Sequence, residues 1–116
     1  MKKPVKSKKN IIYIDSSGIG KISVGLYIAK LDINESLVFK TKSDQILENI
    51  IKLTKKHNID LTQVEAIHVS TGPGSYTGIR VGIAIAKALS LLLGIPVKNM
   101  NGGDSLDPIY ENDRYK

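Results

Sequence analysis

The chain has 116 residues, of which 41% are hydrophobic and 24% are charged, and it contains no cysteine. This length suits one domain with a modest core and argues against a two-lobed enzyme, while the composition argues against wholesale disorder. A chain without cysteine has no disulfide, thiol catalysis or cysteine-ligated metal, and it suits a reducing compartment, so we expect a cytoplasmic protein.

The net charge of +6 is concentrated at the amino terminus. Residues 1–10 hold five lysines: Lys2, Lys3, Lys6, Lys8 and Lys9. Residues 11–116 therefore carry an excess of only one positive charge. Such runs are usually solvated, although they can also attract RNA phosphates in a salt-sensitive way. Asp15 interrupts the apolar residues that follow, so no signal peptide is expected. Residues 1–10 are interpreted as a basic tail.

Three strands are predicted in the first part of the chain. Residues 11–15 are apolar and lead into a Ser-Ser-Gly turn, and residues 21–30 alternate apolar and polar side chains, so the two segments are expected to form a hairpin. Residues 35–41 give a third strand. Ser43 is placed to cap a helix over residues 44–58, whose apolar residues recur on one side.

The second part of the chain alternates strands and helices. Residues 61–64 favour a short turn or helix, residues 65–71 a strand, Thr77–Leu93 a long helix ending at Gly94, and residues 95–100 a short strand. The order β-β-β-α-β-α-β predicts an α/β fold with a mixed five-stranded sheet and packed helices. We place one domain at residues 11–100 and expect residues 101–116, which are polar, to be a loose tail.

The long apolar helix raises the question of a membrane span. From Val81 to Val97 only Lys87 is charged, but Arg80 and Lys98 bound the run, which is shorter than the roughly 20 residues that a span needs. We expect no membrane association.

The loop before this helix holds three glycines, Gly72, Gly74 and Gly78. It lacks the lysine of a Walker phosphate loop, and Pro73 removes one backbone N–H from any phosphate cradle. A dinucleotide site is weakly indicated by the glycine spacing. The alternative is a tight turn from strand to helix, with Ser75 or Thr77 as the N-cap.

Small residues recur at every fourth position of the helix, at Gly78, Gly82, Ala86, Ser90 and Gly94. They lie on one side of a helix and allow another backbone to approach closely. The side packs either on the chain's own core or on a partner. If it faces a partner, Gly82→Leu should weaken pairing and leave the fold intact.

Other chemistry is sparse. His57 and His68 have no metal-ligand spacing with Asp or Glu, and no nucleophile can be paired with a base, so no catalytic or metal-ligating residue is predicted. Asp15, followed by Ser16, is the one suggestive acid, since actin-like ATPases orient metal and phosphate with an Asp at the end of the first strand. It could equally be a turn residue.

Two stretches resemble a known family. "IDSSG" with "ISVGL", and the unbroken stretch "STGPGSYTGIRVGIAIAKALSLLLGIPV" at Ser70–Val97, are similar to the amino-terminal domain of the bacterial tRNA threonylcarbamoyladenosine biosynthesis protein TsaB. The likeness spans about Ile11–Val97. The family's motif falls on the following residues: Gly72, Pro73, Gly74, Ser75, Thr77, Gly78, Arg80 and Gly82.

The resemblance implies a single actin-like, ribonuclease H-like (ASKHA) domain and a non-catalytic scaffold. Its implied partners are a TsaD-like catalytic subunit and a TsaE-like ATPase, with tRNA reached through the complex and a homodimer as a further form. It also implies that the loop shapes the start of the helix and that Gly78, Gly82, Ala86 and Ser90 lie at the partner interface. No cofactor is expected for this chain alone, whereas ATP or ADP is expected at the joint with a partner, near Asp15 and Ser16.

Two departures from the family pattern stand out. Typical members continue into a second domain, and Lys42 stands where many relatives carry histidine. The alternative function is a free-standing nucleotide-binding or ATP-hydrolysing ASKHA domain that uses Asp15 and the glycine loop. An RNA-binding module built on the lysine tail is a third hypothesis.

Overall fold

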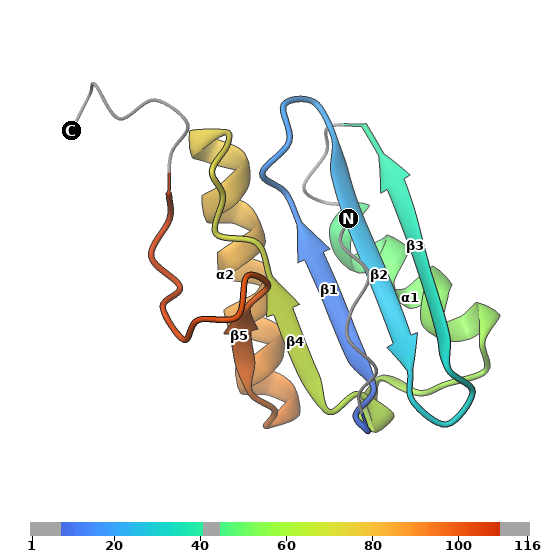
Figure 1. The fold of residues 1–116 in the computed structure, drawn as a ribbon. Coiled ribbons are helices and arrows are strands. Elements are labelled where there is room, and N and C mark those ends of the chain that lie inside the picture. The colour runs from blue at the N-terminus through green and yellow to red at the C-terminus, as the bar shows by residue number, and fades with distance from the viewer. Residues whose placement is uncertain (1–7, 41–44, 110–116) are drawn as a thin grey trace.

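The computed structural model describes residues 8–40 and 45–109, which form one five-stranded sheet and two long helices (Figure 1). In chain order the elements are β1 (Ile11–Asp15), β2 (Ile22–Ile28), β3 (Ile33–Phe39), α1 (Gln45–Lys56), the 3₁₀ turn η1 (Leu61–Gln63), β4 (Ala66–Val69), α2 (Tyr76–Leu93) and β5 (Val97–Asn99).

The sheet has the strand order β3-β2-β1-β4-β5. β1 pairs antiparallel with β2, and β2 pairs antiparallel with β3, whereas β4 is parallel to both β1 and β5. The predicted mixed sheet and the predicted first hairpin are confirmed. The parallel pairs form because α1 and α2 each return the chain to the same end of the sheet, which a tight hairpin cannot do.

Both helices lie on one face of the sheet (Figure 1). Strand side chains alternate between the two faces, so Ile12 and Ile14 point to the helices and are fully buried, whereas Ile11 and Tyr13 point to the other face. The main core therefore lies between the sheet and the helices, and a second, small apolar cluster lies on the face that no described helix covers.

The third strand begins earlier than the sequence indicated. Asp32 adopts a left-handed backbone conformation, with φ of 50°, and its N–H donates to the Ala29 carbonyl, which closes a tight turn. The ladder therefore begins at once, with Ile33 opposite Ile28. The predicted cap at Ser43 lies outside the described residues.

The ends of α2 are those that the sequence predicted. Ser75 is the N-cap, and Gly94 ends the helix in the left-handed conformation, with φ of 66°. α2 is long and apolar enough to cross a membrane by length and composition alone. Ile79, Ile83 and Leu89 of α2 belong to the core, whereas most of the helix is not buried.

Residues 101–109 have no helix or strand, as expected, but the prediction that they are loose is wrong. The Ile109 N–H donates to the Thr71 carbonyl at 2.7 Å, and Asn99 Nδ2 donates to both Thr71 Oγ1 and the Ser105 carbonyl. These bonds hold the segment across the glycine loop. Hydrophobic periodicity could not show this, because backbone groups and one asparagine make the contacts.

Tyr13 is the most perturbed titratable group of the sheet. Its ring meets the edge of the His68 ring, with the centroids 5.2 Å apart. Burial, with a contribution from Tyr27, raises the pKa of Tyr13 to about 12. Burial, with a contribution from Lys98, lowers the pKa of His68.

The raised pKa of Tyr13 makes the stability of the fold sensitive to alkali. In the unfolded chain Tyr13 loses its proton near pH 10, whereas the folded chain keeps it to about 12, so the contribution of Tyr13 to the free energy of unfolding should be constant below pH 10 and fall between pH 10 and 12. Urea unfolding across this range should show a smaller fall for Tyr13→Phe. The exposed Tyr76→Phe is the control. An identical fall in all three proteins would contradict the prediction.

Candidate functional site

The first strand ends in a turn that Asp15 organises. Asp15 Oδ1 accepts hydrogen bonds from the Ser17 backbone N–H at 3.0 Å and from Ser17 Oγ at 2.6 Å. One carboxylate oxygen thus holds the turn from β1 toward β2. The sequence left open whether Asp15 orients metal and phosphate or stabilises a turn. The two hydrogen bonds to Ser17 show that it stabilises the turn.

The glycine loop lies against this turn. The Ser75 N–H donates to the Ser17 carbonyl at 3.0 Å, and Ser75 Oγ accepts from the Gly78 N–H at 3.3 Å as the N-cap of α2. A side chain at Gly74 would overlap the Ser17 carbonyl, so glycine is needed for the close approach of the two loops. The Gly72–Pro73 peptide is cis. The loop therefore starts the helix and joins it to β1.

Ser16 joins β1 to the first turn of α2. Its side chain is buried, and Ser16 Oγ donates to the Gly78 carbonyl at 2.5 Å. A methyl group at Gly82 would overlap Ser16 Oγ, and one at Gly78 would overlap the Ser16 carbonyl. Ser16 therefore joins the end of β1 to the first turn of α2, and its predicted place near a bound nucleotide stays a prediction.

The predicted partner interface along the small residues of α2 is corrected by these contacts. Gly82 and Ala86 are buried inside the chain, Gly78 lies against Ser16, and Ser90 Oγ donates to the Ile95 carbonyl. Gly78 and Gly82 let α2 approach the end of β1, and Ser90 bonds the segment before β5. The four residues are not a free surface. Of the two alternatives that the sequence left open, this side of α2 packs on the chain's own core and not on a partner.

The opposite side of α2 is the exposed one. We call it the outer face; it consists of Val81, Ala84, Ile85, Ala88, Leu91 and Leu92. Leu91 and Leu92 are 86% and 80% exposed, whereas Val81 and Ile85 are half-buried against the core. The spacing of these residues is that of a helix side. Sequence reasoning missed the face because α2 is apolar nearly all round.

Arg80, the charged residue of the family motif, lies beside this face. Its Nη1 donates to the Tyr76 hydroxyl at 3.1 Å, and its guanidinium carbon is 5.3 Å from the centre of the Tyr76 ring. Lys87, one further charged residue of α2, is exposed, and the helix has no acidic residue. The side of the helix that meets solvent is thus apolar and positively charged.

A cleft of about 240 Å³ lies between the β1–β2 turn and the start of α2. Its polar lining includes the Ser16, Lys21, Ser75 and Thr77 side chains. Lys21 was not among the candidate residues, since it follows the turn and belongs to no motif. A lysine beside a helix start can attract an anion. The hydroxyl groups of Ser16 and Ser75, however, already make hydrogen bonds to α2.

The two histidines lie apart from this cleft. His57 Nε2 is 2.7 Å from Glu35 Oε1, and Lys56 Nζ is 2.6 Å from Glu35 Oε2. The hydrogen bonds from Lys56 and His57 lower the pKa of Glu35. His68 lies on the face that no described helix covers, against Tyr13. Within residues 8–40 and 45–109, no three His, Asp or Glu side chains are grouped so as to hold a metal ion.

Together, the strand order, the hairpin at the end of β1 and the two helices on one face form a mixed α/β domain, and this architecture is compatible with the predicted ASKHA-like domain. YeaZ from Pseudomonas aeruginosa has the same fold, with a TM-score of 0.72 at 24% identity over 79% of this chain and 43% of that one. The family model of TsaD, tRNA N6-adenosine threonylcarbamoyltransferase, matches residues 36–106, and the chain belongs to this family.

Within the family the chain is similar to TsaB proteins. It is 40% identical over 68 residues to the tRNA threonylcarbamoyladenosine biosynthesis protein TsaB of Haemophilus influenzae, covering 59% of this chain and 28% of that protein. It is 38% identical over 89 residues to TsaB of Buchnera aphidicola subsp. Schizaphis graminum, covering 75% and 41%. The predicted resemblance and fold are confirmed. The chain spans less than half the length of these relatives.

Proposed function

We propose that the chain is a non-catalytic pairing subunit of a cytoplasmic complex that forms threonylcarbamoyladenosine in tRNA. The likeness to TsaB proteins supports a place in this biosynthesis. In the proposed role the chain binds and positions a TsaD-like catalytic subunit, a TsaE-like ATPase joins the complex, and tRNA is contacted through the assembly.

The observation that carries the pairing role is the outer face of α2. Two leucines, Leu91 and Leu92, are almost fully exposed beside Ala84 and Ala88, whose small side chains allow another helix to approach. Exposed apolar patches of this kind mark interaction sites. The TsaD model matches residues 36–106, which include α2, so a TsaD-like partner has a related helix to offer.

Charge also favours a different protein over a second copy at this face. Arg80 and Lys87 lie on the solvent side of α2, which has no acidic residue. Two copies packed through this helix would bring like charges together, whereas a partner with acidic residues would be attracted. The proposed partner surface is therefore apolar with an acidic rim.

Binding to a TsaD-like protein of the same organism tests the proposal. Titration of this chain into the purified partner should give a saturable complex at low micromolar concentration, and tRNA modification by the partner should depend on added chain. Absence of binding at these concentrations, or modification at full rate without the chain, would contradict the proposal.

The nucleotide-binding alternative is tested on the same sample. The cleft near Ser16 and Lys21 is where a phosphate would enter, and we propose that ATP or ADP binds there only in the complex. Calorimetry with ATP and magnesium should show no submillimolar binding to the chain alone. Submillimolar binding by the free chain that is lost in Asp15→Ala would favour the enzyme instead.

A further inference from the structure

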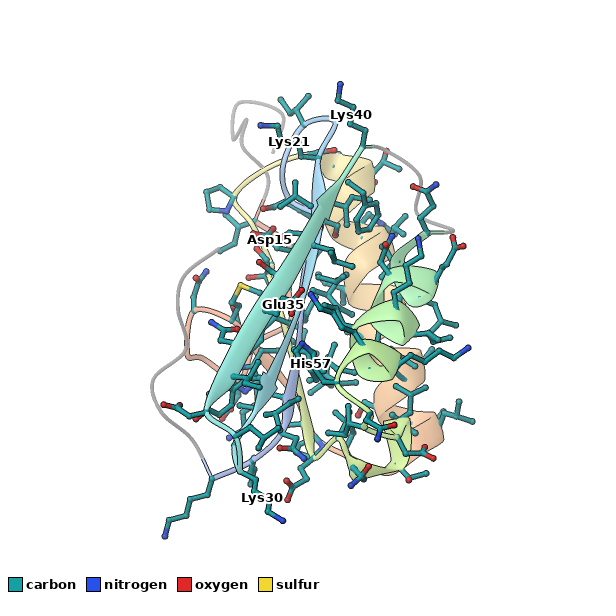
Figure 2. The ribbon with its side chains drawn as sticks, turned by 90° about the vertical axis from the view of Figure 1, so that its right-hand side faces the viewer. Asp15, Lys21, Lys30, Glu35, Lys40 and His57 are labelled. Atoms are coloured by element: carbon teal, nitrogen blue, oxygen red, sulfur yellow. The ribbon has the colours of Figure 1, made fainter. Side chains whose placement is uncertain are left out.

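The turn after β5 holds an Asn-Gly pair, Asn101 and Gly102. Of the seven asparagines in the chain, Asn101 alone precedes a glycine. Both residues are exposed, and Gly102, with φ of 101°, has open space where a side chain would begin. Figure 2 shows the turn after β5, in pale orange, on the side of the sheet away from α1 and α2. Water and hydroxide can therefore reach this peptide.

The hydrogen bonds of this turn are ones that water can replace. The Gly102 N–H donates to the Asn99 carbonyl at 3.0 Å. Among the described residues, the Asn101 side-chain amide makes one contact, from Nδ2 to the Gly72 carbonyl at 3.5 Å, the long limit of a hydrogen bond. Exposed turn bonds open at little cost in free energy. Opening frees the Gly102 nitrogen and the Asn101 amide, which are neighbours along the chain.

We propose that Asn101 is a site of self-deamidation. The Gly102 nitrogen gives up its proton and attacks Cγ of Asn101, so that a cyclic imide forms and the side-chain nitrogen leaves as ammonia. Water then opens the imide at either of its carbonyl carbons and gives aspartate or isoaspartate. The net reaction consumes water and releases ammonia, with no oxidation or reduction. Glycine favours the attack, because it has no side chain to crowd the nitrogen.

Asn99, in the same turn, is protected from this reaction. Its side chain is half-buried, and its Nδ2 donates to Thr71 Oγ1 at 2.9 Å and to the Ser105 carbonyl at 3.1 Å. Its Oδ1 also accepts from the Asn101 N–H at 2.9 Å. Met100 follows it, and a residue with a side chain hinders the attacking nitrogen. The turn therefore contains its own control asparagine.

Deamidation changes how residues 101–109 lie on the glycine loop. It replaces the Asn101 donor with a carboxylate beside the Gly72 carbonyl, and two acceptors repel each other. Isoaspartate also routes the main chain through the side-chain carbon, which lengthens the path between Asn99 and Ile109. Both of these residues are bonded to Thr71. The bond from the Ile109 N–H to the Thr71 carbonyl should therefore open more often.

Ageing the purified chain in mildly alkaline buffer tests the proposal. Peptide mass mapping should find exchange of amide for acid at Asn101, and isoaspartyl methyltransferase should label the same peptide. The rate should rise with hydroxide concentration, because the attacking nitrogen must lose its proton. Asn99 and the exposed Asn34, which precedes a glutamate, should stay unchanged. Asn101→Gln should abolish the labelling, because its longer side chain cannot close the same ring.

Two results of the ageing experiment would overturn the proposal. One is an Asn101 that is still unchanged after weeks in alkaline buffer, which would mean that the turn does not open to the reaction. The other is conversion of Asn34 at the same rate, which would mean that Gly102 gives Asn101 no advantage.

Asn101→Asp, which carries one product of the reaction, tests the effect on residues 101–109. Hydrogen exchange of the Ile109 amide should be about fivefold faster than in the unchanged chain, as for the loss of one hydrogen bond. Asn34→Asp adds the same charge at an exposed position of β3 and should leave this exchange unchanged. Equal Ile109 exchange in the unchanged chain, the aged chain and Asn101→Asp would overturn the effect. Neither experiment involves a partner, so the proposed function stands or falls separately.

Discussion

Gly82→Leu is expected to lower the melting temperature by more than about 10 °C, or to prevent folding. Even the first carbon of the new side chain overlaps Ser16 Oγ, which is buried and bonded to the Gly78 carbonyl. Overpacking in a core costs about 1–3 kcal/mol, and loss of the Ser16 hydrogen bond adds roughly 1 kcal/mol. This is a large part of the stability of a domain of this size.

Three companion variants make the Gly82 result specific. Ala88→Leu adds a side chain of the same size to the outer face of α2 and should leave the melting temperature unchanged, because Ala88 is exposed. Gly82→Ala should be partly rescued by Ser16→Gly, since the second change removes the atoms that the new methyl group meets. Thermal unfolding followed by circular dichroism measures these four variants and the unchanged chain. If Gly82→Leu melts at the same temperature as the unchanged chain, the contact of α2 with β1 is wrong.

Leu92→Glu is expected to raise the dissociation constant for a TsaD-like partner at least about 30-fold. Truncating or charging a central apolar contact costs about 2 kcal/mol or more. The fold should not suffer, because Leu92 is 80% exposed. Calorimetric titration measures the binding, and the melting temperature of the free variant shows whether the fold is intact.

Thr62→Glu is the matched control for Leu92→Glu, because it adds the same charge at an exposed position of η1, which is not part of α2. It should bind the partner as the unchanged chain does. Leu91→Glu should resemble Leu92→Glu, since Leu91 is 86% exposed on the same face. Unchanged affinity in both leucine variants would place the interface elsewhere.

Local rules predicted most of the fold. The alternation in β2, the cap at Ser75 and the helix end at Gly94 each depend on a few neighbouring residues, and the structure confirms them. The mixed sheet followed from the order of the elements, because a strand that returns after a helix pairs in parallel. The unbroken stretch Ser70–Val97 was enough to indicate the family.

Only the tertiary structure decided which way α2 faces. The helix is apolar nearly all round, so its sequence carries little periodic signal, and small residues suit a core contact as well as a partner. The choice depends on Ser16, 66 positions before Gly82 in the chain, and no local rule links the two. The same holds for the contact of Ile109 with Thr71, because it joins residues that only the folded sheet brings together.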